Sequence, residues 1–362
     1  MAPTAPSSLH VLLAGGGTGG HVFPALAVGE ELQARGWRVS FTGSTAGLEE
    51  RLVTQRGLPF FPLPAKPLVG RGPLGKAQAL VTLASSGRAA SKLIRRIGAH
   101  VVLGTGGYVS APAVLGARLA RRPVLLLEPN GRAGVANRWL SRWATAAAVG
   151  YRETLADLKC PCFVTGVPVR PVFFSIPQEL PAEAPRLLVL GGSQGAQQIN
   201  KAMPEAAARL FEKFPSLSIL HQAGARNLDE TRAAYGEEMK NVEVVPFLDD
   251  VAGAMANSHL LVSRAGAITI AEICAAGRAS LLVPLAIAQG HQVDNARLLV
   301  EAGGAEMIRS DELSAEELTG QLAELLADRN RLAAMGQAAR SLARPRAVAA
   351  IADRVEELGG VR

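Results

Sequence analysis

Two stretches of the chain repeat one arrangement, in which an apolar strand runs into a glycine-rich turn and then into a helix. The first strand covers residues 9–14, and its turn, residues 15–21, reads Gly-Gly-Gly-Thr-Gly-Gly-His. The second strand covers residues 186–190, and its turn, residues 191–196, reads Gly-Gly-Ser-Gln-Gly-Ala. Glycines let a backbone turn tightly, and the start of the following helix offers unpaired amides to an anion. The repetition predicts two Rossmann-like domains, each with a ligand-binding turn.

The first turn is compatible with more than one kind of site. Gly15, Gly17 and Gly20 have the spacing of the dinucleotide fingerprint, which would indicate an NAD-type oxidoreductase. The next strand-like run, residues 37–41, is not followed by the acidic residue that binds a ribose 2′-hydroxyl. A P-loop is excluded, because no Gly-Lys-Ser/Thr follows the glycines. A tight turn that binds nothing is the remaining alternative, and His21 at the start of the helix favours a functional site instead.

Strand-like and helix-like stretches alternate through the chain, which is typical of a doubly wound parallel sheet. The pattern resets near residue 164, where proline and turn residues form a linker. We predict an α/β protein with domains at residues 1–168 and 169–342, followed by an amphipathic helix within 343–362. The expected strands of the first half are residues 9–14, 37–42, 100–103 and 123–127, and its expected helices are 24–35, 46–56, 76–97 and 109–121.

Positive charge is concentrated in the first half of the chain. Residues 1–170 contain 20 Lys and Arg against 7 Asp and Glu, whereas the remainder contains 18 against 24. The asymmetry indicates contact with nucleic acid or with an anionic membrane, unless it is only a solvated basic surface. Between residues 68 and 97, basic residues flank apolar ones without aromatics to stack on bases, which favours the membrane. Residues 138–143 are a second such place, although core packing explains their two tryptophans equally well.

Cysteine usage and hydropathy bear on location. Cys160, Cys162 and Cys274 form neither a disulfide framework nor a zinc site, which is typical of a reducing cytoplasm. No run of about 18 apolar residues occurs, and residues 1–8 do not resemble a signal peptide. We therefore expect a protein that is neither secreted nor membrane-spanning.

Further turns follow other predicted strands. Residues 104–108 and 128–130 follow two strands of the first half, at the sheet edge where doubly wound folds bind ligands. In the second half, a small-residue turn at 264–266 leads into a helix that carries Glu272. Such a helix start can hold a diphosphate while a carboxylate accepts sugar hydroxyls, although helix-end capping would also account for Glu272.

Five motifs occur in order: Gly-Gly-Thr-Gly-Gly-His at 16–21, Gly-Thr-Gly-Gly-Tyr-Val at 104–109, Gly-Val-Pro-Val-Arg at 166–170, Gly-Gly-Ser-Gln-Gly-Ala at 191–196 and the turn 267–272. As a set they resemble the MurG family, bacterial glycosyltransferases that add N-acetylglucosamine to the lipid-linked muramyl-pentapeptide precursor of peptidoglycan. The resemblance implies a GT-B architecture, two Rossmann-like doubly wound domains facing across a cleft. It also implies a last helix that returns to the first domain, with UDP-N-acetylglucosamine (UDP-GlcNAc) held mainly by the second domain and lipid I by the first.

The resemblance further implies an inverting transfer to the C4 hydroxyl of the muramyl sugar of lipid I, which gives lipid II. His21 is the candidate catalytic base, although a positional or acceptor-binding role is equally compatible. Arg170 and Ser193 would face the diphosphate, and Glu272 would hold the ribose. The substrate-binding set is Thr18, Gly19, Gly20, Asn130, Arg170, Ser193, Leu248, Ala267, Ile268, Thr269, Ile270, Ala271, Glu272 and Gln292, with Gly106, Gly107 and Tyr108 on the acceptor side.

No Asp-x-Asp motif occurs, so we expect no metal and no cofactor, with a helix start and a cation in their place. Leu127, Pro129 and His291 depart from the family pattern, which puts any role of these positions in doubt. The resemblance implies UDP-GlcNAc, lipid I and the anionic inner-membrane surface as partners, with no nucleic acid. It places the protein peripherally, at the cytoplasmic face of the bacterial cell membrane.

Two alternatives remain open. A non-enzymatic nucleotide-sugar or membrane-binding module would retain the glycine turns but would not need His21 and Glu272. Another GT-B transferase, with a UDP-sugar donor and a different lipid or soluble acceptor, is the stronger competitor. Donor turns are shared more widely than acceptor surfaces, so the donor side does not decide between acceptors.

Overall fold

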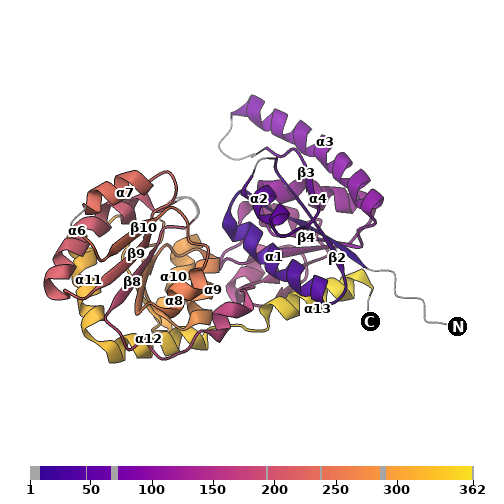
Figure 1. Cartoon of the computed structure of the whole chain (residues 1–362). Helices are drawn as coiled ribbons and strands as arrows, with labels where there is room; N and C mark the ends of the chain where they lie inside the picture. The colour runs from indigo at the N-terminus through magenta and orange to yellow at the C-terminus, as the bar shows by residue number, and fades with distance from the viewer. Residues whose placement is uncertain are drawn as a thin grey trace. The chain divides into compact units, whose positions relative to one another are not determined.

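The structure is a computed structural model that describes residues 9–45, 47–66, 72–192, 195–236, 239–285 and 291–360. It divides into two compact units: unit 1 is Met1–Pro168 with Arg346–Arg362, and unit 2 is Val169–Pro345. Each unit is built on a parallel sheet between layers of helices (Figure 1). The predicted α/β class with two doubly wound sheets is confirmed.

In the described part of unit 1, the sheet has the strand order β3-β2-β1-β4-β5-β6-β7. The chain builds the sheet outward from β1 in one direction and then from β4 in the other, so the crevice of a doubly wound fold lies at the carboxyl ends of β1 and β4. The strands are β1 (His10–Ala14), β2 (Arg38–Gly43), β3 (Phe60–Pro62), β4 (Val101–Gly104), β5 (Val124–Glu128), β6 (Ala146–Val149) and β7 (Cys162–Val164). The helices are α1 (Gly19–Ala34), α2 (Leu48–Thr54), α3 (Pro73–Ile97), α4 (Gly107–Ala120), α5 (Val135–Leu140), the 3-10 helix η1 (Arg152–Asp157) and α13 (Ala347–Gly359).

Successive residues of the central strands of unit 1 pack on opposite faces of the sheet. In β1, Val11 and Leu13 join a buried cluster with α1 and α13, whereas Leu12 and Ala14 join a cluster with α3 and α4. A parallel strand that is covered on both faces is apolar at every position. This is why continuous apolar runs predict the central strands of this chain.

The last helix, α13, packs against α1 (Figure 1). Ile351 and Val355 are fully buried there. Arg35, just beyond the end of α1, forms ion pairs with Asp353 at 2.7 Å and Glu356 at 2.9 Å. The apolar face of α13 is thus part of the core of unit 1.

In the described part of unit 2, the sheet has the strand order β10-β9-β8-β11-β12-β13, which again reverses on either side of the first strand. The strands are β8 (Arg186–Leu190), β9 (Ser218–Gln222), β10 (Val242–Val245), β11 (Leu260–Ser263), β12 (Ala279–Leu282) and β13 (Ala305–Met307). The helices are the 3-10 helix η2 (Pro171–Ser175), α6 (Gln197–Lys213), α7 (Leu228–Tyr235), α8 (Val251–Ala256), α9 (Ala267–Ala276), α10 (His291–Glu301), α11 (Ala315–Ala327) and α12 (Arg329–Ser341).

The first helix begins earlier than the sequence predicts. Gly19 and Gly20 are helical, so His21 lies inside the first turn of α1 and Pro24 lies within the helix. Pro24 is the sixth residue of α1 and has no amide hydrogen, so the Gly20 carbonyl lacks the donor that a helix normally provides four residues farther on. The shift matters for function, because the helical geometry now fixes the direction of the His21 side chain.

Candidate functional site

The carboxyl ends of the neighbouring strands β1, β4 and β5 bring together the predicted site residues of unit 1. After β1 the chain turns through Gly15–Thr18 into α1, and after β4 it turns through Thr105 and Gly106 into α4. β5 ends at Glu128, two residues before Asn130. Because parallel strands end at one edge, three separate sequence motifs meet in one place.

His21 is partly exposed and is held by two threonines. Its Nδ1 lies 3.1 Å from Oγ1 of Thr18, and the hydroxyl of Thr105 donates to its backbone carbonyl at 2.7 Å. Gly106 and Gly107 have φ values of 93° and 70° and lie against the imidazole. A Cβ on Gly106 would lie 3.3 Å from His21 Cδ2, tighter than ordinary van der Waals contact. Glycine at these positions therefore allows α4 to begin close beside His21.

The pKa of His21 reflects two opposing effects. Burial lowers the pKa, whereas the negative charges of Glu128 and Glu49 raise it. The net shift is downward, so the imidazole is mostly unprotonated at neutral pH. An unprotonated imidazole is the form that can accept a proton from a hydroxyl group.

Glu128 is buried at the end of β5 and organises the turn that follows. Its carboxylate accepts hydrogen bonds from the backbone and side-chain amides of Asn130, at 3.1 and 2.8 Å. It also accepts from the Gly134 amide at 2.9 Å and from the side-chain amide of Asn137 at 3.0 Å. Asn130 is thus fixed at the sheet edge that carries His21.

Glu49, in the first turn of α2, is a site residue that the sequence does not reveal. It is fully buried, and its carboxylate accepts hydrogen bonds from the hydroxyl and amide of Ser44, at 2.5 and 2.9 Å, and from the Gly17 amide at 3.2 Å. Burial alone would raise the pKa of Glu49, but these hydrogen bonds outweigh burial and lower it. A glutamate in the first turn of a helix is ordinary, so no pattern in the sequence distinguishes it.

In unit 2, the start of α9 follows β11. Gly266 is the N-cap and has no side chain to bond the first amides. The Ile270 amide already donates to the Gly266 carbonyl at 2.9 Å. The start of α9 therefore offers a ligand the amides of residues 267–269, which precede this first helical hydrogen bond.

Glu272 lies in the second turn of α9 and is partly exposed. Burial raises its pKa to about 7, and the positive charge of Arg170 opposes that shift. The Arg170 guanidinium also stacks over Phe173, 5.1 Å from the ring centroid. A carboxyl group and a guanidinium therefore lie near each other in this unit.

The remaining predicted residues are placed as follows. Gln292 is the second residue of α10, and its Oε1 accepts a hydrogen bond from the Leu285 amide at 3.0 Å. Leu248 is partly buried against the core of unit 2, and Tyr108 is 42% exposed on α4. Ser193 lies outside the described residues. In the ranges that are described, no group of three or more His, Cys, Asp or Glu side chains is arranged to hold a metal ion.

Comparison with known proteins identifies the family. Residues 11–149 match the N-terminal domain model of glycosyltransferase family 28, and residues 186–354 match its C-terminal domain model. The chain belongs to glycosyltransferase family 28. Both glycine-rich turns, His21 and Glu272 lie inside the matched ranges.

Within glycosyltransferase family 28, the chain is similar to UDP-N-acetylglucosamine–N-acetylmuramyl-(pentapeptide) pyrophosphoryl-undecaprenol N-acetylglucosamine transferases. It is 43% identical to that of Halorhodospira halophila, over 96% of this chain and 98% of the relative. It is 40% identical to that of Ectopseudomonas mendocina, over 96% and 98%. Among solved structures, MurG of Acinetobacter baumannii is 32% identical with a TM-score of 0.78, over 96% of this chain and 99% of that chain. The predicted membership of the MurG family is confirmed.

A more distant structure shows how widely the fold occurs. The glycosyltransferase of kitacinnamycin has a TM-score of 0.71 but only 19% identity, over 98% of this chain and all of that chain. At this identity the similarity concerns the fold alone. Together with the MurG structure, it agrees with the GT-B class predicted for this member of glycosyltransferase family 28.

Proposed function

We propose that this protein transfers N-acetylglucosamine from UDP-GlcNAc to the C4 hydroxyl of the muramyl sugar of lipid I, with inversion, to give lipid II for peptidoglycan synthesis. The observation that carries this proposal is the 43% identity, over nearly the whole of both chains, to a transferase named for this donor and acceptor. Residues 11–149, assigned here to the acceptor, match the N-terminal domain model of the same family and lie within the part of the chain that aligns with this relative.

In this proposal His21 is the general base. The acceptor hydroxyl gives its proton to the imidazole as its oxygen attacks the anomeric carbon, and UDP leaves from the opposite face. The downward shift of the His21 pKa supports the role, because the base must be unprotonated before the reaction. Gly106, Gly107 and Tyr108 are assigned to the acceptor side, and Thr18, Gly19, Gly20 and Asn130 to substrate contacts from unit 1.

Unit 2 is assigned the nucleotide. Arg170 and the amides of the first three residues of α9 supply positive charge to the diphosphate, which has to leave with an additional negative charge. Glu272 accepts hydrogen bonds from the ribose hydroxyls, and the backbone of Leu248 contacts uracil. Ser193 is assigned to the diphosphate, and Gln292 and Ala271 complete the donor contacts. Because Arg170 and the helix start carry the charge, we expect no metal requirement.

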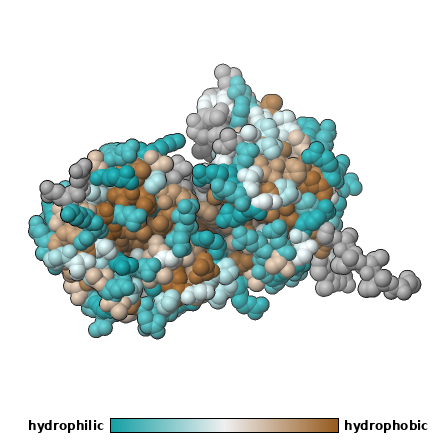
Figure 2. Space-filling model, in the orientation of Figure 1, coloured by the Kyte–Doolittle hydropathy of each residue, from teal (hydrophilic) through white to brown (hydrophobic). Residues whose placement is uncertain are grey.

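The exposed surface of unit 1 supports a peripheral association with an anionic membrane at its cytoplasmic face. On α3, Leu80 and Val81 are exposed, and Arg88, Lys92, Arg95 and Arg96 are exposed farther along the helix. On the face drawn in Figure 2, hydrophilic side chains of unit 1 alternate with small apolar patches. No helix in the described ranges is long and apolar enough to cross a bilayer. A helix that exposes both apolar and cationic side chains favours binding at an anionic membrane surface.

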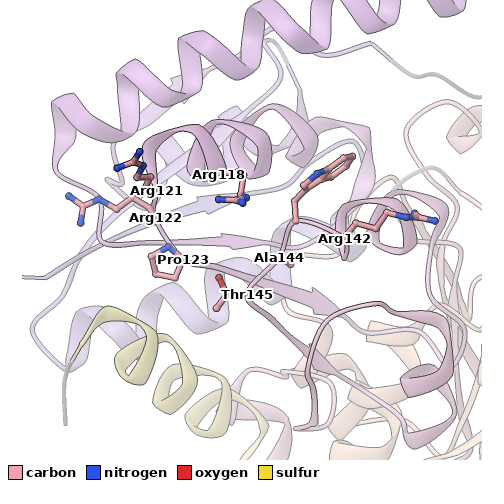
Figure 3. A pocket seen from close by; sticks show the side chains of 8 residues that line it. Arg118, Arg121, Arg122, Pro123, Arg142, Ala144 and Thr145 are labelled. Atoms are coloured by element: carbon pink, nitrogen blue, oxygen red, sulfur yellow. The ribbon is translucent and has the colours of Figure 1, made fainter.

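A basic pocket of about 450 Å³ adds to this surface (Figure 3). The pocket lies where β5 and β6 begin and is lined by four arginines, Arg118, Arg121, Arg122 and Arg142. None of the four forms an ion pair within the described residues. Arg121 has a φ of 57° at the end of α4, a left-handed position that favours glycine. The four guanidinium groups of the pocket, and not this backbone conformation, support contact with anionic headgroups.

The test is transfer of labelled GlcNAc to a short-chain lipid I analogue, with EDTA present and with and without anionic vesicles. We expect transfer under chelation, and a higher rate with vesicles of phosphatidylglycerol than with phosphatidylcholine. Donor binding without transfer to this acceptor would show that the acceptor assignment is wrong. Transfer that stops on chelation would show that the expectation of metal independence is wrong.

A further inference from the structure

The loop that precedes His21 is built around a buried carboxylate. Glu49 has no exposed surface, and it lies below the turn that joins β1 to α1. An ideal Cβ on Gly16 would lie 2.3 Å from its Oε1, and one on Gly43 would lie 2.5 Å from its Cγ. Real Cβ atoms do not approach so closely, so Gly16 and Gly43 leave the space that this side chain fills. Several glycines of the region are therefore explained by Glu49 and not by a ligand.

The hydrogen bonds of Glu49 connect separate parts of unit 1. Its Oε2 accepts a hydrogen bond from the amide of Gly17, 32 residues away in the turn between β1 and α1. Its Oε1 accepts hydrogen bonds from the amide and the hydroxyl of Ser44, just after β2. Gly17 has a φ of 83°, a conformation that glycine adopts freely and that does not fix the loop by itself. A charge-assisted hydrogen bond to a buried carboxylate provides the missing constraint.

We propose that Glu49 is a positioning residue, whose buried carboxylate fixes the Gly15–Gly17 turn and thereby the place and charge environment of His21 at the start of α1. The inference rests on the proposed role of His21 as the base. Its geometric part follows from the path of the chain, because only Thr18, Gly19 and Gly20 separate the clamped turn from His21.

The negative charge of Glu49 also affects the pKa of His21. The charged groups that act on His21 are Glu128, from the end of β5, and Glu49, from α2, and both favour the protonated imidazole. Thr18 and the start of α4 face the ring without charge. Loss of the Glu49 charge would lower the pKa of His21 further. The acidic limb of kcat/KM, where His21 loses activity by protonation, would then move to lower pH.

Two substitutions separate geometry from charge. Glu49→Gln keeps the length of the side chain and removes the charge, and Glu49→Asp keeps the charge but retracts the carboxylate by one methylene. We expect both to lower kcat, by about a hundredfold for a displacement of the base on the order of 1 Å. Only Glu49→Gln should move the acidic limb. Glu50→Gln removes a charge from the next residue of the same helix and should leave rate and pH profile unchanged.

A measurement without turnover keeps this inference distinct from the proposed reaction. The imidazole of His21 is titrated by NMR in the wild type and both variants, with the resonance assigned from His21→Asn. We expect a lower titration midpoint in Glu49→Gln only. If the wild type transfers GlcNAc but all midpoints coincide, or if both variants keep kcat within about twofold, Glu49 does not position the base. If the wild type transfers nothing, the proposed reaction fails and the midpoints still decide the effect of Glu49 on His21.

Discussion

Unit 1 has a positive net charge, and the charges that act on its candidate base are negative. Unit 2 has a negative net charge, and the charge that acts on its candidate site is positive. Unit 1 contains 22 Lys and Arg against 10 Asp and Glu, yet the two carboxylates Glu49 and Glu128 act on His21. Unit 2 contains 16 Lys and Arg against 21 Asp and Glu, yet the positive charge of Arg170 acts on Glu272 in α9. The net charge of a unit thus does not predict the charges that act on its candidate site.

The contrast follows from what each site has to stabilise. Carboxylates near an imidazole favour its protonated form, which the base becomes once it has taken a proton. A guanidinium and a helix start favour the negative charge that develops on a leaving diphosphate. On the proposed roles, we expect proton transfer to depend on unit 1 and departure of the anion to depend on unit 2, and the following substitutions test that division.

His21→Ala should have the largest effect. Loss of a general base typically lowers kcat by about 10²- to 10⁴-fold, whereas the nucleotide contacts assigned to unit 2 remain. Single-turnover transfer and calorimetric binding of UDP-GlcNAc, measured on the same preparation, separate the two effects. A loss of donor affinity as large as the loss of rate would contradict the division between the units.

Arg170→Gln should show the opposite pattern. Removal of a charged hydrogen-bond donor from the diphosphate costs about 2 kcal/mol, which corresponds to a roughly thirtyfold higher Kd for UDP-GlcNAc. Arg226→Gln, at an exposed position of unit 2, removes the same charge as a control. Unchanged affinity in Arg170→Gln would mean that the diphosphate lies elsewhere.

Glu272 makes donor binding depend on pH. Its pKa of about 7 means that the carboxyl becomes protonated as the pH falls through neutrality, and a protonated carboxyl is a poorer acceptor for two ribose hydroxyls. We expect UDP-GlcNAc to bind about tenfold more weakly at pH 6 than at pH 8, with release of a proton on binding near pH 7. Glu272→Gln should bind with little pH dependence, and a wild type that also binds independently of pH would rule out this role.

The sequence predicts best those strands that a local run of apolar residues specifies. The strands β1, β2, β4, β5 and β8 are found where apolar runs place them, because the middle of a parallel strand covered on both faces consists mainly of apolar residues. The sequence does not predict the strands β3, β6, β7, β12 and β13. β6 consists of three alanines and a valine, and its strand character depends on pairing with β5 and β7.

Tertiary contacts explain what the sequence could not reveal about the site. The carboxylate of Glu49 reaches Gly17 only because α2 folds back under the first turn. Trp139 and Trp143 fit two interpretations in the sequence. In the structure their rings meet edge to face at 4.4 Å and pack against the core of unit 1, in agreement with the core-packing alternative. The roles of His21, Arg170 and Glu272 stay predictions until the substitutions are measured.

Arg35→Ala should give the smallest effect, and it tests whether the two units respond independently. Arg35 forms ion pairs with Glu31, Asp353 and Glu356, and the guanidinium is only 24% exposed. A network of partly buried pairs is stronger than one surface pair, so we expect a loss of about 1 kcal/mol of unfolding free energy. Hydrogen exchange should increase in α1 and α13, while exchange in the helices of unit 2 and the Kd for UDP-GlcNAc remain unchanged.

Arg209→Ala, which removes a single exposed pair with Glu205 on α6, is the matched control in the other unit. Faster exchange throughout unit 2 in Arg35→Ala would mean that the units unfold together, and stability could then no longer be assigned to one unit alone.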